Sequence, residues 1–237
     1  MIVLALDTCD SRGSVAALRD DTVLHVIPHD SSEDYSSWLL PAVDRVLQGS
    51  GLEMANVDGY AVAAGPGSFT GVRVGLTTVK AWAEVYGKRI SAVSRLEAMA
   101  MLGALGSSHV AAFVDAHRGQ VFGAIFQRKG KVLERLGEEM VIPPEKFIEA
   151  AAELANGGSI SWVSIDAGVL ASAENWKARE ARGEHVESVS GVLAPAIGRI
   201  GTRELAAGRF TGALSLDANY VRRSDAEIFW QGAAHGG

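Results

Sequence analysis

The sequence has a single cysteine, no long apolar run and no extended basic segment, and each absence excludes a class of protein. With Cys9 alone, no internal disulfide can form, which is typical of proteins from a reducing compartment. No segment approaches the roughly 18 uninterrupted apolar residues that a membrane span needs. The first apolar run ends at Asp7 without a basic residue before it, which predicts a β-strand rather than a signal peptide. We therefore expect a cytoplasmic protein.

The chain is acidic, with 22 Lys and Arg, 28 Asp and Glu, and a net charge of -6. Proteins that bind nucleic acid on their own are more often basic, because they neutralise phosphates. No basic run here exceeds the pair Arg222–Arg223, so direct, tight RNA binding is disfavoured. The hydrophobic content of 48% is enough for a sizeable core in one large domain or two small ones.

The rest of the pattern is a series of strands and helices that occurs twice. Short apolar runs predict three strands at the start, with a hairpin turn at residues 19–21, and apolar spacings of three and four predict the helices. Ser31 or Ser32 is expected to cap the first helix. After the three strands, the first series continues with a helix at 32–48, a strand at 57–64, a helix at 70–86, a strand at 89–93 and a helix at 94–105. The second series, again after three strands, has helices at 144–155, 170–181 and 192–207 and strands at 159–166 and 185–189.

The match between the two series is strongest after the first strand of each, where LD-x4-RGSV at residues 6–15 corresponds to VD-x2-RGQV at 114–121. Two βββαβαβα series predict an α/β protein with the duplicated actin-like (ASKHA, ribonuclease H-like) fold. Its halves would be residues 1–105 and 106–237, with the tail after about residue 210 free to pack back on the first half. In this layout nucleotide phosphates face the turns at 7–13 and 115–119. A chance run of α/β units is the alternative.

Several strings occur in one order along nearly the whole chain: LALDT, LLPAVDRVL, VDGYAVAAGPGSFTGVRVG, VDAHRGQVFGAIF and NYVRRSDAE. Together they resemble the landmarks of the TsaB family, bacterial proteins of tRNA threonylcarbamoyladenosine formation. GPGSFTG at residues 65–71 is the most specific of them, whereas the two strand–aspartate motifs alone would be weak.

This resemblance implies a non-catalytic subunit with an actin-like fold and no required cofactor. Its expected partners are a TsaD-type catalytic paralogue and a TsaE-type ATPase, which together transfer a threonylcarbamoyl group to adenosine 37 of tRNA. The chain would meet tRNA only through this complex, and without its partner it could form homodimers. Whether Arg222 and Arg223 contact the partner or tRNA stays open, and surface arginines in solvent are the favoured interpretation.

The glycine-rich string at residues 65–71 is the first candidate for a ligand site. It is not a P-loop, which needs lysine where Val72 stands, and it is not GxGxxG, because Gly71 arrives one residue late. Free N–H groups at a helix start still attract anions. A tight turn that lets the next helix pack closely also explains the glycines, and this interpretation is favoured. The residues kept as candidates for phosphate or nucleotide binding are Asp7, Thr8, Gly65, Gly67, Ser68 and Gly71.

Metal and nucleophile chemistry are both disfavoured by position. His25 and His29 have the i, i+4 spacing of helical metal ligands, but they lie in a β-rich run with Pro28, where four residues span about 13 Å. One zinc ion cannot bind both at about 2.1 Å from there. Cys9 could meet His117 only if the fold joined them, and a buried loop cysteine is the simpler interpretation. We expect no catalytic and no metal-ligating residue.

An autonomous ATP-dependent kinase or hydrolase of the actin-like superfamily is the alternative function. Active members have a second phosphate turn rich in glycine and threonine, whereas residues 115–119 contain one glycine and two bulky side chains. The first turn does contain Asp7 and Thr8, residue types that in kinases would orient Mg²⁺ and phosphate. Independent ATP hydrolysis is therefore disfavoured, while weak ATP or ADP binding, or binding shared with a partner, stays open. A metalloprotease is a poor third choice, because the helix at 32–48 has no histidine.

The helices at 32–48 and 71–86 carry more apolar surface than one core-facing stripe requires. The family resemblance implies that this surplus is the contact with the catalytic paralogue. Filling of the domain's own core by Trp38 and Trp82 is the other interpretation. The residues predicted to bind the partner are Trp38, Leu39, Leu40, Val43, Val72, Arg73, Leu76 and Lys80.

Overall fold

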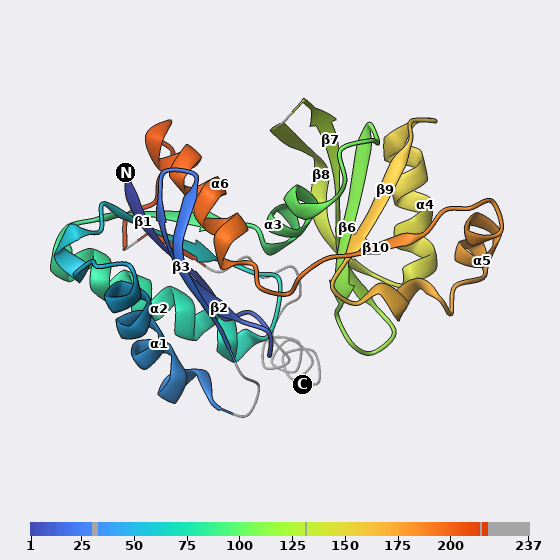
Figure 1. Ribbon diagram of the computed structural model, residues 1–237. Coiled ribbons are helices and arrows are strands. Elements are labelled where there is room, and N and C mark those ends of the chain that lie inside the picture. The colour runs from blue at the N-terminus through green and yellow to red at the C-terminus, as the bar shows by residue number, and fades with distance from the viewer. Residues whose placement is uncertain (30–32, 131, 214, 218–237) are drawn as a thin grey trace, which may run out of the picture.

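The computed structural model describes residues 1–29, 33–130, 132–213 and 215–217 (Figure 1). The first series of elements is β1 (Ile2–Asp7), β2 (Ser14–Arg19), β3 (Thr22–Pro28), α1 (Tyr35–Gly49), β4 (Gly59–Ala63), α2 (Phe69–Tyr86), β5 (Arg89–Val93) and α3 (Arg95–Leu102). The second is β6 (His109–Asp115), β7 (Val121–Lys129), β8 (Val132–Ile142), α4 (Pro144–Ala155), β9 (Ile160–Ser164), α5 (Glu174–Glu180), β10 (Val186–Ser188) and α6 (Ala194–Ala206). No helix in these ranges is long and apolar enough to cross a bilayer.

Each series forms one five-stranded sheet, and the two sheets have the same strand order. The first sheet runs β3-β2-β1-β4-β5, and the second, read in the corresponding direction, runs β8-β7-β6-β9-β10. In both sheets the first three strands are antiparallel and the last two pair in parallel. The predicted duplication is confirmed, and the chain has the duplicated actin-like α/β fold.

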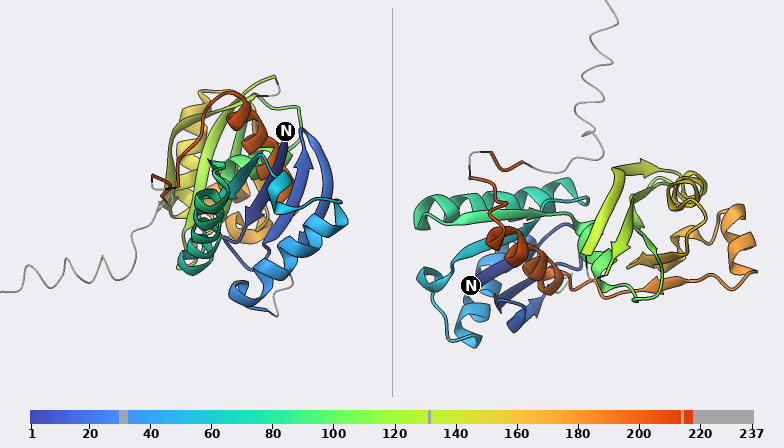
Figure 2. Two further views of the ribbon diagram at one scale, coloured as in Figure 1. Left: turned by 90° about the vertical axis from the view of Figure 1, so that its left-hand side faces the viewer. Right: turned by 90° about the horizontal axis from the view of Figure 1, so that it is seen from above.

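The last helix of each series packs against the sheet of the other series. Helix α3 contacts β6, β7, β8 and β9, and α6 contacts β1, β2, β4 and β5. Figure 2 shows α6 lying across the strands of the first sheet. The predicted boundary between residues 105 and 106 lies between α3 and β6. In space, however, α3 packs with the second sheet and α6 with the first, so each spatial half contains one helix from the other half of the sequence.

Helix α6 covers the face of the first sheet opposite to α1 and α2. Gly201 of α6 is so near β4 that a Cβ there would lie 2.4 Å from the Cβ of Ala61. Gly75 of α2 faces Val62, the next residue of β4, where an added Cβ would be 3.5 Å from Val62 Cγ2. Successive strand side chains point to opposite faces, so the first sheet is sandwiched between these helices.

One hydrophobic core runs through both halves, and a smaller one lies in the second half. The larger core joins both faces of the first sheet to the α3 face of the second, where Val110, Ala112 and Val163 are buried. The smaller core lies on the other face of the second sheet, with Phe113 and Trp162 buried beneath α4 and α5. The α3 face therefore binds the second half to the first.

Some element boundaries differ from the prediction. Helix α1 begins at Tyr35, with Asp34 at the N-cap and no side-chain capping bond, while the predicted caps Ser31 and Ser32 lie outside the described residues. The single helix predicted at 170–181 is wrong: a 3-10 turn at Ala167–Leu170 buries Leu170, and α5 then starts separately at Glu174.

The start of the C-terminal tail returns to β5, the open edge of the first sheet. Thr211 and Ile90 exchange backbone hydrogen bonds of 2.8 and 3.4 Å. The guanidinium of Arg89 lies 4.2 Å from the centre of the Phe210 ring, and Leu216 is 2% exposed.

The close approach of α6 to β4 predicts that Gly201→Val destabilises the protein. A valine there would clash with Ala61, so we expect a loss of about 2 kcal/mol in the free energy of unfolding. Urea unfolding followed by tryptophan fluorescence measures it. Gly106→Val is the matched control, because nothing lies within 4 Å of a Cβ at Gly106; equal effects of both variants would contradict the packing argument.

Candidate functional site

The turn that follows β1 contains a buried ion pair. Asp7, the last residue of β1, is 0% exposed and Arg95, the first residue of α3, is 1% exposed. Arg95 Nε lies 3.3 Å from Asp7 Oδ2, and its Nη2 lies 2.5 Å from Asp10 Oδ2. The N–H of Arg95 donates to the carbonyl of Gly65 at 2.8 Å. One arginine thus joins the β1 turn, α3 and the glycine-rich turn.

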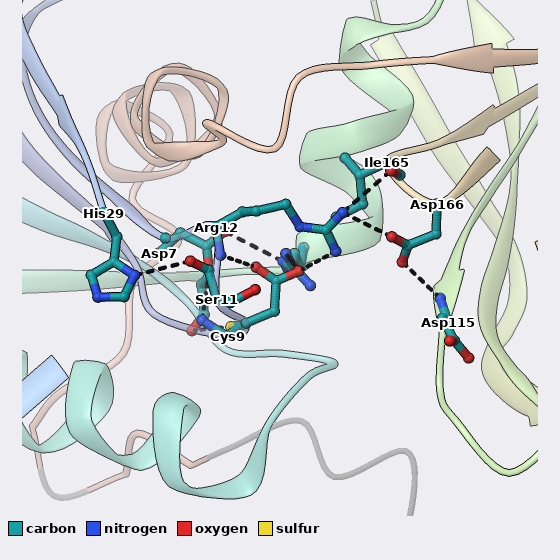
Figure 3. A network of polar contacts seen from close by, with 12 residues as sticks. Asp7, Cys9, Ser11, Arg12, His29, Asp115, Ile165 and Asp166 are labelled. Atoms are coloured by element: carbon teal, nitrogen blue, oxygen red, sulfur yellow. Dashed lines mark hydrogen bonds and ion pairs between the residues drawn. The ribbon is translucent and has the colours of Figure 1, made fainter. Parts of the chain in front are cut away.

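A second arginine extends this network into the second half (Figure 3). Arg12 Nη2 lies 2.8 Å from Asp10 Oδ2, and its Nη1 lies 2.8 Å from Asp166 Oδ1. The other carboxylate oxygen of Asp166 accepts from the Asp115 N–H at 3.0 Å. Negative and positive side chains therefore alternate from the end of β1 to the turn after β9, in the order Asp7, Arg95, Asp10, Arg12 and Asp166.

The arginines determine the charge of this network. Burial alone would raise the pKa of Asp10, but the charge and hydrogen bond of Arg95, together with Arg12, lower it below its ordinary value. Burial would lower the pKa of Arg95, and the charges of Asp7 and Asp10 raise it instead. Both side chains are therefore ionised at neutral pH. The carboxylates of Asp7 and Asp10 are thus paired with arginines of the same chain.

Tyr35 and His29 hold the β1–β2 loop against α1. The Tyr35 hydroxyl donates to the Asp10 carbonyl and accepts from the Gly13 N–H at 2.9 Å. The His29 ring stacks on Tyr35 with 4.2 Å between centroids, and its two nitrogens lie 2.9 and 2.8 Å from the carbonyls of Ser11 and Glu33. Burial and the charge of Asp7 raise the pKa of Tyr35. The His29 ring thus joins the β1–β2 loop to the start of α1.

The glycine-rich turn packs directly on Thr8 and Cys9. The Ser68 N–H donates to the Cys9 carbonyl at 2.6 Å, and Thr8 Oγ1 donates to the Gly71 carbonyl at 2.7 Å. A Cβ at Gly67 would lie 2.3 Å from Cys9 O, and one at Gly71 would lie 2.0 Å from Thr8 O. The close approach explains why glycine stands at both positions.

The predicted phosphate-binding residues are therefore brought together, but several of their polar groups already bond to one another or to Cys9 and Arg95. Asp7 and Thr8 are fully buried, and Asp7 also accepts from the Cys9 N–H at 2.9 Å. Ser68 caps α2 by accepting from the Gly71 N–H at 3.4 Å, and the Gly65 carbonyl accepts from Arg95. A phosphate at this turn would have to displace bonds that hold β1, α2 and α3 together.

The turn of the second half, at residues 115–119, has an unusual backbone. His117, Arg118 and Gly119 are left-handed, with φ of 59°, 57° and 71°, and the His117 N–H donates to Asp115 Oδ1 at 2.7 Å. The His117 side chain is 85% exposed, whereas Cys9 is fully buried with its Sγ 3.7 Å from the Ala63 carbonyl. Burial and the charge of Asp7 raise the pKa of the Cys9 thiol, which keeps it a poor nucleophile.

No group of three or more His, Cys, Asp or Glu side chains that could hold a metal ion occurs in the ranges that the structure describes. His25 lies in β3 with its ring beside Gly49 of α1, about 2.9 Å from the position of an added Cβ. The His29 ring nitrogens lie close to the carbonyl oxygens of Ser11 and Glu33. The two histidines therefore serve the packing of α1 on the sheet.

Comparisons with known proteins identify the family of this chain. The family model described as TsaD, tRNA N6-adenosine threonylcarbamoyltransferase, matches residues 22–205. The tRNA threonylcarbamoyladenosine biosynthesis protein TsaB of Bacillus subtilis is 33% identical over 153 residues, which cover 65% of this chain and 67% of that protein. TsaB of Escherichia coli is 33% identical over 71% of this chain and 72% of its own. The chain belongs to the TsaB family.

Solved structures extend the TsaB likeness to nearly the whole chain. YeaZ from Pseudomonas aeruginosa superposes with a TM-score of 0.74 at 25% identity and covers 92% of this chain and 99% of its own. A second Pseudomonas aeruginosa structure, described as similar to peptidase YEAZ, has a TM-score of 0.69 at 26% identity. The arrangement of both halves is therefore that of TsaB-family proteins.

The predicted partner-binding residues of this TsaB-family chain divide into two groups. Five of them are buried in its own core, so their assignment to a docking surface is corrected: Trp38, Leu39, Val43, Val72 and Leu76 are 2–5% exposed. Their apolar side chains cover the first sheet. Leu40 is 58% exposed, Arg73 is exposed and Lys80 is partly exposed. These three residues alone of the eight lie where a partner could meet them.

Sequence reasoning missed the arginines of the ion-pair network. Arg95 lies 88 residues from Asp7, and Arg12 lies 154 residues from Asp166. The available signal was the position of Arg95 at the start of an otherwise alanine- and methionine-rich helix, of which Leu96, Ala98, Met99 and Ala100 are buried in the structure. A charged side chain there needs a buried partner of opposite charge.

The buried pair predicts a strong effect of Arg95→Met. Asp7 would remain as an uncompensated buried charge, and we expect a loss of about 3–5 kcal/mol in stability. Asp7→Asn keeps an acceptor for the Cys9 N–H, so in that background Arg95→Met should cost much less. Chemical denaturation of the four proteins in this double-mutant cycle measures the difference, and additive effects would contradict the pairing.

The depressed pKa of Asp10 predicts a pH-dependent contribution to stability. That contribution is complete above the unfolded-state pKa of about 3.9 and is lost as pH falls through the lower folded-state value. Asp10→Asn should therefore destabilise the protein by about 1–3 kcal/mol at pH 7. Unfolding free energies measured from pH 7 to pH 3 should show the two proteins converging at the acid end; a constant gap would contradict the prediction.

Proposed function

We propose that this chain is the non-catalytic subunit of a cytoplasmic complex that forms threonylcarbamoyladenosine in tRNA. It binds a TsaD-type catalytic paralogue and acts with a TsaE-type ATPase, so tRNA meets the chain only within the complex. Membership of the TsaB family supports this role, because the Bacillus subtilis and Escherichia coli relatives are named for tRNA threonylcarbamoyladenosine biosynthesis.

The observation that carries the non-catalytic assignment is that the carboxylates of the first turn are already held in ion pairs within the chain. Asp7 pairs with Arg95, and Asp10 pairs with both Arg95 and Arg12, where a kinase of this fold would place metal and phosphate. The second turn carries the bulky His117 and Arg118 in place of small residues. The proposed role requires no cofactor of the chain itself, and ATP or ADP binding would be weak or shared with the partner.

The proposed docking face consists of the outward sides of α1 and α2, which lie side by side on the first sheet (Figure 1). Leu40 is 58% exposed, and Val85 and Tyr86 near the end of α2 are 75% and 40% exposed. Arg73 and Lys80 add positive charge to the same helix. Apolar residues with a charged rim are typical of protein interfaces, and without its partner this face would support a homodimer.

The docking face predicts that Leu40→Glu and Val85→Glu each abolish binding to the TsaD-type paralogue while the chain stays folded. Both side chains point to solvent in the free chain, so the new charge costs little until an interface buries it unpaired. Size-exclusion chromatography of each variant with the partner, beside circular dichroism, makes the measurement. Leu105→Glu is the control, because Leu105 is also 75% exposed but lies beyond α3.

The pathway assignment is tested in cells. Deletion of the gene should remove threonylcarbamoyladenosine from bulk tRNA, as measured by mass spectrometry of nucleosides, and wild type and Leu105→Glu should restore it. Leu40→Glu should not. Persistence of the nucleoside at full level in the deletion strain, or enzyme-like ATP turnover by the purified chain alone, would overturn the proposal.

A further inference from the structure

A second site lies away from the ion-pair network, on the open edge of the first sheet. A cavity of about 450 Å³ that opens to solvent is lined by residues of β5, the start of α3, α6 and the first residues of the tail. Ala92, Glu97, Glu204, Arg209 and Thr211 are among the residues that line it. It combines an unpaired strand edge with two carboxylates, and it is separate from the proposed docking face on α1 and α2.

The strand edge in this cavity offers one free donor and one free acceptor. Ile90 exchanges both of its backbone hydrogen bonds with Thr211, and the Val93 carbonyl accepts from Ala64 on the β4 side. Because alternate residues of a strand point their N–H and C=O to opposite sides, those of Ala92 point to the open edge, as those of Ile90 do. No backbone partner of Ala92 on that edge occurs in the described ranges.

The described start of the tail, as far as residue 213, does not fill the position opposite Ala92. Arg209 would continue the antiparallel pairing there, but its N–H donates to the Glu204 carbonyl at 2.9 Å. From Thr211 the tail runs toward the Arg89 end of β5, away from Ala92, because the bridge is antiparallel. Residues 209–213 therefore leave this position open to another segment.

The two carboxylates in the cavity differ in their partners. Arg209 holds Glu204 with two bonds of 2.5 and 2.8 Å. Glu97, in the first turn of α3, has no side-chain hydrogen bond or ion pair among the described residues. Burial and the charge of Glu204 raise the pKa of Glu97, with Glu139 acting in the same direction and Arg203 and Arg135 against it. A cation beside Glu97 would relieve this cost.

We propose that this cavity binds an arginine side chain carried on the extended backbone of a separate polypeptide. The backbone of that segment pairs with the N–H and C=O of Ala92, in the manner of an added strand. Its guanidinium fork lies against the Glu97 carboxylate, which accepts two parallel hydrogen bonds. This site goes beyond the proposed function and does not depend on it.

The test uses N-acetyl-argininamide as the probe and the full chain labelled with ¹⁵N. Saturable shifts of the Ala92 and Thr211 amide signals are expected. N-acetyl-norleucinamide, which has a side chain of similar length without charge, should give none. Glu97→Gln should weaken probe binding at least tenfold. Glu149→Gln makes the same change on α4 of the second half, where Glu149 pairs with Lys146, and should leave binding unchanged.

Three results would overturn the proposal. The first is the absence of any shift at Ala92, and the second is equal binding of the probe to wild type and to Glu97→Gln. Circular dichroism of both proteins establishes that the comparison is between folded chains.

The third result that would overturn the proposal concerns the source of the arginine, because Arg222 and Arg223 of the chain's own tail lie outside the described residues. Tighter probe binding by the double variant Arg222→Gln, Arg223→Gln would show that the chain's own tail competes for the cavity.

Discussion

The structure depends on the buried pair of Asp7 and Arg95. A carboxylate at the inner end of a central strand is costly unless an opposite charge accompanies it, and Arg95 is brought from the start of α3 to meet it. This contact fixes the position where the chain leaves the first sheet for the second. Asp10, Arg12 and Asp166 then continue the same alternation of charge to the second half. The ion pairs of the β1 turn therefore connect the first half of the molecule to the second.

The fold was largely predictable from the sequence, because each element is recorded in a local pattern. The two series of strands and helices, the hairpin at Asp20 and the close packing behind Gly71 follow from apolar spacing and turn residues within a short window. The exchange of α3 and α6 was not predictable in this way. Each helix has an apolar face, and nothing in its spacing states which sheet that face will cover.

The candidate site was predictable only in part. Asp7 and Thr8 stand out beside the first strand, but their partners lie far along the chain. The sequence therefore favoured a packing turn but left phosphate binding open, at a place where the structure has internal bonds. The same limit explains the buried residues among those assigned to the partner. Trp38 and Leu76 have the apolar character of an interface, and only their position over the sheet shows that the chain itself covers them.

The exchange of the final helices has a consequence for synthesis of the chain on the ribosome. The first sheet is complete once β5 has emerged, yet one of its faces stays uncovered until α6 follows about a hundred residues later. At about 5–20 residues per second, that face is exposed to water for several seconds and is open to chaperones during that time. The first sheet is therefore covered on both faces only after most of the second half has been synthesised.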